Sequence, residues 1–459
     1  MYDVIIIGAG PAGLFSAFAL RKKKVLLIEK GKQIEDRRCP LGKNGKCPPC
    51  EPCNILSGIG GAGLFSDGKL NFTPKHGKTD ISEFMDLEKA QKLIDKTEEI
   101  FSQFGMDGKV YPTDMETAIE IKEKAKKAGI DLLLIKQKHM GSDKLPGYIK
   151  SMILFLQKEG VEIITETEVK NILVKNNAVT GVETDKGTFY ASKVIAAPGR
   201  VGSEWLYEQA KSLNIKLKQR GIEVGVRVEV PKEIMDPITN IIYDPTFFIM
   251  TDTYDEQVRT FCVNQGGFVS KENYFDFVCV NGHACIDRKS NNTNFALLSK
   301  VILTEPVTNN YSYGKYIANL ATLLGNGKPL IQRYIDLKRG RRSTAERILK
   351  SYVKPTLEDA VPGDISMALT KRIVTLTDHE VPLTPTEYEL LKLLVMNAGK
   401  VLTHRQLLRE VWGAAYEQEL HILHVNISNL RHKIEPDHSR PQFIITEPGV
   451  GYRLKTSQY

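Results

Sequence analysis

The chain begins with a short hydrophobic run in which apolar and polar residues do not alternate. Residues 4–7 are Val-Ile-Ile-Ile, and a run of this kind predicts a buried parallel strand. The run breaks at the glycine-rich residues 8–13, resumes as an apolar helix over 14–20, and is followed by a second apolar strand over 25–28 that ends at Glu29. Strand, glycine turn, helix, strand and acid in this order predict a Rossmann-like α/β unit.

The three glycines of this turn have the spacing G-x-G-x-x-G, and each serves a different purpose. Gly8 permits the tight turn, Gly10 lets the backbone approach a pyrophosphate, and Gly13 lets the helix pack closely on the strand. The helix N-terminus faces the phosphates, and Glu29 can accept a hydrogen bond from a ribose hydroxyl. The pattern therefore predicts dinucleotide binding; an ordinary glycine-rich turn is the alternative.

The hydrophobic pattern of the next three hundred residues predicts a mixed α and β structure. Residues 80–130 are mostly helical in pattern, and residues 146–158 form a further helix. A strand over 161–169 and further short strands separated by turns follow up to residue 190, and an apolar strand over 193–200 ends in a glycine turn. Residues 215–345 alternate strands and loops, which predicts a β-rich domain inserted into the first. A substrate domain and a purely structural domain both fit this composition.

Two loops between these elements carry further chemistry. Four of the seven cysteines lie close together, at Cys39, Cys47, Cys50 and Cys53. Crowded thiols in a reducing compartment favour a zinc site or an iron–sulfur cluster, although the spacing matches no standard motif. A redox-active thiol pair and unligated cysteines are the alternatives. Residues 58–63 repeat G-x-G-x-x-G without a preceding strand, so we expect a glycine loop that approaches a bound ligand.

After residue 375 the pattern changes to short amphipathic helices. Two capping boxes, at residues 384–387 and 403–406, each open a helix. After the loop 413–418 a third helix carries an apolar stripe made of Leu420, Leu423, Ile427, Leu430 and Ile434. A hairpin around Gly449 follows. Three helices and a hairpin predict a winged helix.

Composition and charge change this picture little. The chain has 459 residues and a net charge of +8, which fits two or three globular domains. Residues 375–459 contain 9 Lys/Arg and 10 Asp/Glu, so the positive excess lies outside the predicted winged helix and does not indicate DNA binding. Asp3 stands where a signal peptide would carry basic residues, and no segment reaches transmembrane length. We therefore expect a cytoplasmic protein with no membrane contact.

Five segments of the first 370 residues occur in a characteristic order: residues 8–29, 60–70, 197–200, 259–262 and 362–365. Together they resemble a family of uncharacterised FAD-dependent dehydrogenases, over residues 1 to about 373. The resemblance implies that FAD does the redox chemistry while the protein positions it. It implies FAD contacts at Gly8, Gly10, Pro11, Ala12, Gly13, Glu29, Lys30, Gly61, Ala62, Gly63, Ser66, Asp67, Lys69, Val169, Ala197 and Gly199. No catalytic residue can be named.

The chain departs from that family at its end. Such proteins close the flavin site with a further strand and a Gly-Asp turn, whereas here the resemblance stops near residues 372–374. We therefore expect a sheet without one inner strand, with uncovered apolar surface and backbone donors, and impaired FAD binding. Whether the chain is an enzyme stays open.

Five segments of the last 85 residues carry a second resemblance: residues 383–388, 399–403, 411–413, 429–433 and 449–453. They resemble the OmpR/PhoB-type effector domain of response regulators, nearest those that control potassium uptake (Kdp). The resemblance implies DNA contacts at His421, His424, Val425, Ser428, Asn429, Arg431, Lys433, Thr446, Gly449, Tyr452 and Arg453. The third helix would enter the major groove, Arg431 and Lys433 would meet phosphates, and the wing would reach the minor groove. Loop 413–418 would touch RNA polymerase.

Two departures concern this second half. No phosphoreceiver domain precedes the winged helix, so phosphorelay control in cis and receiver dimerisation are absent, and the oligomeric state stays open. The DNA-facing residues are rich in His, Ser and Asn, so affinity should be modest and should rise as His is protonated.

The sequence thus predicts a Rossmann-like FAD-binding domain (1–214), an inserted β-rich α+β domain (215–345), a remnant of the first domain (346–374) and a C-terminal winged helix (375–459). The predicted function is a DNA-binding transcriptional regulator of promoters, fused to a flavoprotein domain. The alternatives are a FAD-dependent oxidoreductase with a passive winged helix, and two unrelated reading frames joined near Ile373. The substrate, the electron donor and the DNA site cannot be predicted.

Overall fold

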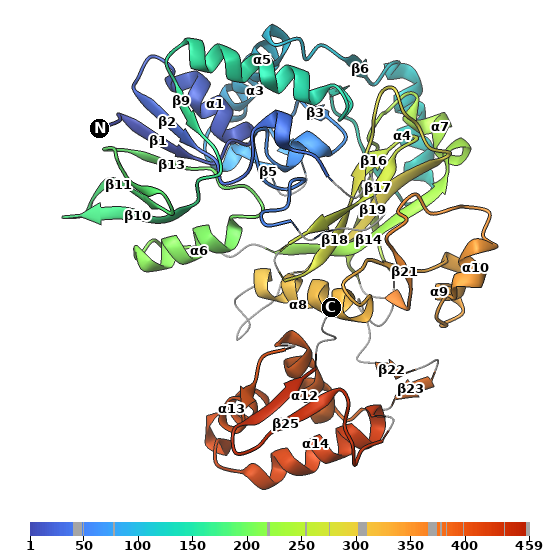
Figure 1. Ribbon diagram of the computed structural model, residues 1–459. Coiled ribbons are helices and arrows are strands. Elements are labelled where there is room, and N and C mark those ends of the chain that lie inside the picture. Colours follow the sequence, from blue (N-terminus) through green and yellow to red (C-terminus); the bar gives the residue numbers. More distant parts are fainter. Residues whose placement is uncertain are drawn as a thin grey trace. The chain divides into compact units, whose positions relative to one another are not determined.

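The computed structural model describes residues 1–39, 48, 50–76, 79–217, 221–252, 255–274, 276–301, 310–365, 374–376, 379–381, 383–397, 399–435 and 437–455. The chain divides into two compact units (Figure 1). The first consists of Met1–Phe275, Cys279–Thr308 and Pro355–Glu358, and the second of Asp276–Val278, Asn309–Lys354 and Asp359–Tyr459.

A four-stranded parallel sheet in the order β13-β1-β2-β9 forms the nucleotide-binding half of the first unit. Strand β1 (Val4–Ile7) pairs with β13 (Val194–Ala196) on one side and with β2 (Val25–Ile28) on the other. Strand β9 (Glu162–Ile164) pairs with β2. Every residue of β1 and β2 is buried, which explains why these strands are apolar without alternation. The predicted Rossmann-like unit is confirmed.

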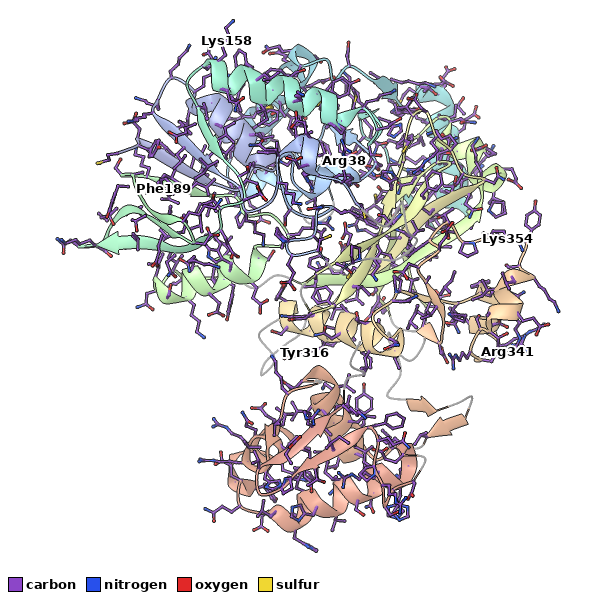
Figure 2. All side chains as sticks on the ribbon, in the orientation of Figure 1. Arg38, Lys158, Phe189, Tyr316, Arg341 and Lys354 are labelled. Atoms are coloured by element: carbon purple, nitrogen blue, oxygen red, sulfur yellow. The ribbon has the colours of Figure 1, made fainter. Side chains whose placement is uncertain are left out.

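Each face of this sheet is covered by a different layer, as Figure 1 shows. Val4 and Ile6 belong to a core shared with three helices, and Ile5 and Ile7 belong to a core shared with an antiparallel sheet. The helices are α1 (Pro11–Leu20), α3 (Leu87–Gln103) and α5 (Leu145–Lys158). The sheet consists of β10 (Val169–Lys175), β11 (Ala178–Thr184) and β12 (Gly187–Tyr190). In Figure 2, Phe189 marks this sheet and Lys158 marks the end of α5.

The helical layer is fixed by aromatic contacts as well as by aliphatic burial. The Phe18 ring of α1 stacks on Phe155 of α5 at 5.7 Å and meets Phe104 edge-on at 6.1 Å between centroids. Ile6 is fully buried beneath this layer. Replacing Ile6 with Ala should cost about 2–5 kcal/mol of unfolding free energy, because the burial of the removed methyl groups is lost and a cavity remains.

The predicted helices and strands between residues 80 and 190 are largely confirmed. Residues 80–130 contain α3 and α4 (Met115–Lys127), and Asn176 and Asn177 make the β10–β11 turn with positive φ values of 52° and 61°. The strand predicted from Val161 is shorter than expected. It ends at Ile164, and Glu166 has a φ of 50°, which interrupts extended backbone.

The other half of the first unit is β-rich, as predicted. Its main sheet is antiparallel, in the order β14-β19-β16-β15-β7. These strands are β14 (Ile222–Pro231), β19 (Asn292–Val301), β16 (Gln257–Asn264), β15 (Thr246–Met250) and β7 (Asp131–Leu133). Helix α7 (Lys232–Thr239) follows β14 and was not expected, because its eight residues include Pro237.

Smaller elements complete this unit. Strands β3 (Lys69–Asn71), β8 (Gln137–His139) and β6 (Lys109–Tyr111) form one sheet, and β17 (Phe268–Asn273) pairs with β18 (Val278–His283). The remaining elements are η1 (Ile34–Asp36), η2 (Ala62–Phe65), β4 (Lys75–His76), β5 (Thr79–Asp80), η3 (Ile81–Glu83), and α6 (Ser203–Ser212).

The second unit contains short elements followed by a winged helix. The former are α8 (Asn310–Leu324), β20 (Leu330–Ile331), α9 (Tyr334–Lys338), α10 (Ala345–Leu349) and β21 (Val361–Pro362). The latter comprises β22 (Val374–Leu376), β23 (His379–Val381), α12 (Pro385–Met396), β24 (Leu402–Thr403), α13 (His404–Trp412), η4 (Ala414–Tyr416), α14 (Leu420–Ile434), β25 (Ile444–Glu447) and β26 (Gly451–Leu454).

The winged helix has its own hydrophobic core and both predicted capping boxes. Thr384 Oγ1 accepts the Glu387 N–H, and Thr403 Oγ1 accepts the Gln406 N–H, each with the reciprocal bond. The predicted stripe of α14 supplies four buried residues, namely Leu423, Ile427, Leu430 and Ile434. The expected fold is therefore confirmed. The predicted limits of the four domains stay a prediction. Among the described residues, no helix has the length and apolar character needed to cross a bilayer.

Candidate cofactor site and nucleic-acid interface

Two of the three glycines in the first turn are required by the protein itself. A Cβ on Gly8 would lie 2.3 Å from Ala197 O, and one on Gly13 would lie 1.8 Å from Gly8 O. Gly10 differs, because the nearest atom to a Cβ there is Gly61 Cα, at 3.8 Å. The fold does not exclude a side chain at Gly10. The empty space beside it is what a ligand at the N-terminus of α1 would need.

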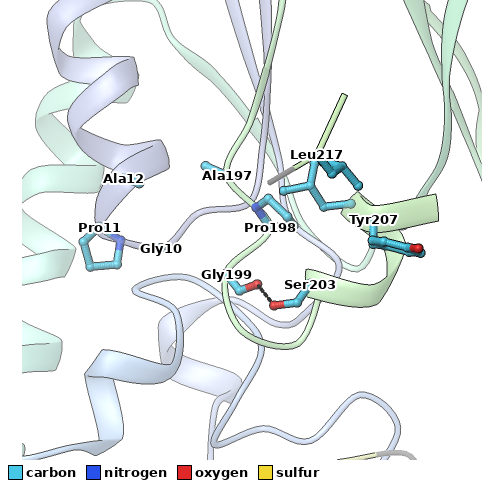
Figure 3. Close-up of a pocket in the computed structure, with 10 residues that line it drawn as sticks. Gly10, Pro11, Ala12, Ala197, Pro198, Gly199, Ser203, Tyr207 and Leu217 are labelled. Atoms are coloured by element: carbon cyan, nitrogen blue, oxygen red, sulfur yellow. Dashed lines mark hydrogen bonds between the residues drawn. The ribbon is translucent and has the colours of Figure 1, made fainter. Parts of the chain in front are cut away.

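A pocket of about 420 Å³ opens at this point (Figure 3). Its volume lies within the usual range for small-molecule sites. Five predicted cofactor residues line it together: Gly10, Pro11, Ala12, Ala197 and Gly199. Five further lining residues were not predicted: Pro198, Ser203, Leu206, Tyr207 and Leu217. Most of these belong to α6, a helix the sequence analysis did not identify; its Ser203 Oγ lies 3.5 Å from Gly199 O.

Glu29 lies beside the turn but uses both carboxylate oxygens within the protein. Oε2 accepts the Ala9 N–H at 2.8 Å, and Oε1 accepts the N–H groups of Gly31 at 2.8 Å and Gly58 at 2.9 Å. The residue is 6% exposed. Glu29 therefore joins the first glycine turn to the loop at residues 58–63. Its predicted contact with a ribose hydroxyl stays a prediction.

Arg37, which was not predicted from the sequence, binds the carbonyl groups of the same region, as Glu29 binds its N–H groups. Its guanidinium is buried and donates to the carbonyl groups of five residues, at 2.7–3.3 Å: Asn54, Ile55, Gly58, Ile59 and Gly61. Burial lowers the pKa of Arg37 to about 10, although the Glu29 carboxylate acts to raise it. No local sequence signal marks this residue, because its partners are backbone atoms about twenty positions away.

The remaining predicted cofactor residues lie elsewhere in the first unit. Asp67 and Lys69 are buried as an ion pair at 3.0 Å, and Lys69 also pairs with Asp244, which was not predicted. Val169 is buried in the core beneath the parallel sheet. Gly61, Ala62 and Gly63 belong to the second glycine loop, and Ser66 directly follows η2. The second glycine loop is joined to the first turn by a 2.8 Å hydrogen bond from Gly60 N to Ala9 O. Lys30 is partly exposed.

A buried pair of polar aromatic side chains, Tyr243 and His139, was not expected from the sequence. Tyr243 Oη lies 2.7 Å from His139 Nε2, and the two rings stack at 3.9 Å between centroids. Burial lowers the pKa of His139 to about 4, so the ring is neutral at physiological pH.

The predicted metal site receives no support from the described part of the chain. Within it, no group of three or more His, Cys, Asp or Glu side chains is arranged to hold a metal ion. Cys50 and Cys53 are free thiols, Cys39 is partly exposed just after η1, and Cys47 lies outside the described residues.

The outer face of α14 presents the residues predicted to contact base edges. His421, His424, Val425, Ser428 and Asn429 are all exposed. The apolar stripe of the same helix is buried. The two sets lie on opposite sides because α14 has one face in the core and one in solvent. This arrangement leaves an exposed polar helix face free to enter a groove.

The two residues predicted to meet phosphates have bonds inside the domain. Arg431 donates to Ile444 O at 2.7 Å and to Thr446 Oγ1 at 2.7 Å, which ties α14 to β25. Lys433 Nζ lies 2.6 Å from the Glu387 carboxylate of the first capping box. Both cations thus have structural partners, and their phosphate contacts stay predictions.

The wing residues also divide into exposed and buried. Gly449 is exposed at the tip, and Arg453 bonds Glu447 across the hairpin at 2.8–2.9 Å. Tyr452 is buried, and its ring lies against His404, which the sequence analysis did not single out. The DNA contacts assigned to these wing residues stay predictions.

The fold and these two sites define a winged-helix effector domain fused to a FAD-binding domain. Residues 378–454 match the family "Transcriptional regulatory protein, C terminal", and residues 3–35 match the family "FAD binding domain". The C-terminal part is therefore an OmpR/PhoB-type effector domain, and the start of the N-terminal part is similar to FAD binding domains.

The curated relatives match the C-terminal part. The KDP operon transcriptional regulatory protein KdpE of Escherichia coli is 47% identical over 92 residues, which is 20% of this chain and 41% of that protein. The transcriptional regulatory protein KdpE of Mycobacterium tuberculosis is 40% identical over 115 residues, which is 25% of this chain and 48% of that protein. The chain thus spans less than half the length of either relative.

Solved structures resemble each part separately. The L-amino acid deaminase from Proteus vulgaris is 16% identical, with 68% of this chain and 65% of that chain covered at a TM-score of 0.34. The response regulator DrrB, a Thermotoga maritima OmpR/PhoB homologue, is 35% identical, with 18% of this chain and 37% of that chain covered at a TM-score of 0.17.

Proposed function

We propose that this protein is a DNA-binding transcriptional regulator whose FAD-binding domain is its sensory part. The observation that carries the proposal is the exposed face of α14, set on a winged helix with an intact core and both capping boxes. The Escherichia coli relative is, by its name, a transcriptional regulator of the KDP operon. A promoter of that kind is therefore the first DNA target to test.

In this proposal α14 enters the major groove and its side chains approach base edges. Asn429 can donate and accept toward an adenine, and Ser428 can bond several bases. The wing tip at Gly449 reaches the adjoining minor groove, and loop 413–418 contacts RNA polymerase.

Fluorescence anisotropy with a labelled KDP-type promoter duplex tests this proposal. Full-length protein should bind, the affinity should fall steeply with salt, and Asn429→Ala should weaken binding about 5-fold to 100-fold. Glu410→Gln, on the exposed surface of α13, is the matched control. It removes a negative charge and should not weaken binding. Absence of binding at low salt by correctly folded protein would refute the proposal.

For the FAD-binding domain, the residues present fit a dinucleotide at the open side of Gly10. Gly10, Pro11, Ala12, Ala197 and Gly199 would hold it, with its pyrophosphate at the α1 N-terminus. When bound, FAD would supply electron transfer. The side chains of Tyr207 and Leu217 would shield the pocket from water.

The second candidate function is a FAD-dependent oxidoreductase with a passive winged helix, and the pocket beside Gly10 favours it. An absorption spectrum of the purified protein, before and after incubation with FAD, tests cofactor binding, and NAD(P)H consumption tests activity. Colourless protein that takes up no FAD would exclude this candidate. DNA affinity measured with and without FAD separates the two functions. If the FAD-binding domain is sensory, FAD must change the DNA affinity. If the winged helix is passive, or if two unrelated reading frames are joined, FAD should leave the DNA affinity unchanged.

A further inference from the structure

Three polar side chains that the proposed functions do not use meet at the end of β18. His283 is the last residue of this strand, and Cys285 follows two positions later. The Cys285 Sγ lies 3.4 Å from His283 Nε2. Ser142, from the loop before α5, places its Oγ 3.7 Å from that sulfur and 3.5 Å from the same ring nitrogen.

The contact of the second ring nitrogen of His283 determines which nitrogen carries the proton in the neutral imidazole. Nδ1 lies 3.2 Å from the carbonyl oxygen of Phe65, which can only accept a hydrogen bond. Nδ1 therefore carries the proton in the neutral ring, and Nε2 is left as an acceptor facing the thiol. If the thiol proton moves to Nε2, both N–H groups of the imidazolium have partners: Phe65 O and the sulfur. The geometry thus suits both protonation states.

Ser142 is held by the adjoining backbone. Its N–H and its hydroxyl both point to Ala284 O, at 2.9 Å and 3.0 Å. These two hydrogen bonds hold Ala284, which lies between His283 and Cys285, and thereby fix the distance between the His283 and Cys285 side chains. The hydroxyl can also rotate toward the sulfur.

The groups around this cluster both raise and lower the pKa values of Cys285 and His283. The hydrogen bond from His283 lowers the pKa of the Cys285 thiol, outweighing burial and the Asp143 carboxylate, which raise it. Burial lowers the pKa of His283, but its bond to Cys285 raises it above the ordinary value overall, against the opposing charge of Arg288. Lys289 interacts favourably with the Cys285 thiolate.

Two other thiols of the same unit provide a built-in comparison. Burial raises the pKa of Cys262, and burial beside Glu272 raises the pKa of Cys279 to about 12. The Cys262 thiol faces a carboxylate in place of an imidazole, with its Sγ 3.7 Å from Asp67 Oδ2. A thiolate forms much less readily at these two positions than at Cys285.

We propose that Cys285 is a reactive thiol, with His283 as its proton acceptor, and that its reaction partners are small disulfides. In the step, His283 Nε2 takes the Cys285 proton and the thiolate attacks one sulfur of the disulfide. A new S–S bond forms as the old one breaks, and the leaving thiolate takes the proton from His283. Cys285 is 6% exposed, and the four residues after it are exposed, so the thiol lies just below the surface.

Reaction of the reduced full-length protein with 5,5′-dithiobis(2-nitrobenzoate) tests this inference. The released thiolate gives the rate, and peptide mass spectrometry identifies the modified cysteine. At about pH 6.5 we expect Cys285 to react about ten-fold or more faster than Cys279 and Cys262, since one unit of pKa is a factor of ten in thiolate. The Cys285→Ser variant should lack this phase.

His283→Gln separates a proton acceptor from a purely structural residue. It should slow Cys285 about ten-fold at about pH 6.5, and the rates of variant and wild type should converge near pH 9, where an ordinary thiol ionises unaided. An unchanged pH profile in the variant, or equal rates for the three cysteines in the wild type, would overturn the inference. If the variant does not fold, the wild-type rates still decide between these outcomes.

Discussion

At the scale of single residues, the glycines of the first turn differ in what they are for. Gly8 and Gly13 are enclosed by protein backbone, whereas the space beside Gly10 is open. The motif assigns Gly8 and Gly13 to packing within the protein and Gly10 to the approach of a pyrophosphate, but spacing alone does not show that a methyl group would fit at Gly10 and clash at the other two. The geometry makes that distinction and turns it into a prediction.

We expect Gly10→Ala to weaken FAD binding while leaving the fold intact. Its methyl group would meet no protein atom closer than 3.8 Å but would occupy the space that a pyrophosphate needs. Gly13→Ala, which would clash with Gly8 O at 1.8 Å, should instead destabilise the fold by more than about 2 kcal/mol. Urea unfolding and FAD titration of both variants check this, and Gly147→Ala, where a Cβ meets nothing within 4 Å, is the control.

His139 should make the first unit sensitive to mild acid. Because burial lowers its pKa to about 4 in the folded protein and the unfolded value is about 6.5, the unfolded chain binds more protons between these values. The folded state therefore loses stability as pH falls from about 6.5. Between about pH 7.5 and 5 this residue should cost about 2 kcal/mol of unfolding free energy.

The variant His139→Gln tests this directly, since glutamine does not titrate and can still bond Tyr243. Urea unfolding at both pH values should show a smaller acid-induced loss in the variant than in the wild type. Equal losses in the two proteins would show that other groups cause the acid sensitivity.

At the scale of elements, patterns that depend on neighbours in sequence were predicted well. The apolar strands β1 and β2, the stripe of α14 and both capping boxes follow from spacing within a few residues. Elements defined by distant partners were predicted less well. Helix α6, which lines the pocket, was missed, and β9 is shorter than the strand predicted over residues 161–169 because Glu166 adopts a positive φ.

Arg431 links two elements of the winged helix, so its replacement should affect the fold. Arg431→Met removes the bonds to Ile444 O and Thr446 Oγ1 and should lower the unfolding free energy of this domain by about 1–3 kcal/mol. Asn429→Ala, two positions earlier on the exposed face, should change stability by less than about 0.5 kcal/mol. Chemical unfolding followed by circular dichroism compares the two variants. Equal stability of both would contradict the structural role of Arg431.

At the scale of the whole molecule, the two units have separate hydrophobic cores. We therefore expect two unfolding transitions. The chain offers a reporter for each, since its two tryptophans are Trp205 in the first unit and Trp412 in the second. Replacing Trp412 with Phe leaves Trp205 to report the first unit alone.

Each ligand should act mainly on the transition of the unit that binds it. FAD at about a hundred times its Kd should stabilise the transition reported by Trp205 by about 2.7 kcal/mol, and promoter DNA should shift mainly the transition reported by Trp412. If the FAD-binding domain is sensory, each ligand should also change the shift that the other produces. A single transition that both ligands shift equally would show that the units unfold together. That result would also favour coupling between flavin and DNA.

The pairing of Glu29 and Arg37 with main-chain atoms has a consequence for how this protein can change. Glu29 holds three amides and Arg37 holds five carbonyls. Ordinary ion pairs can be inverted or replaced by a second substitution, whereas backbone polarity is the same for every amino acid. In a random mutagenesis library screened for folded protein, a destabilising substitution of Glu29 should not be rescued by any substitution of Arg37, and the reverse should also hold.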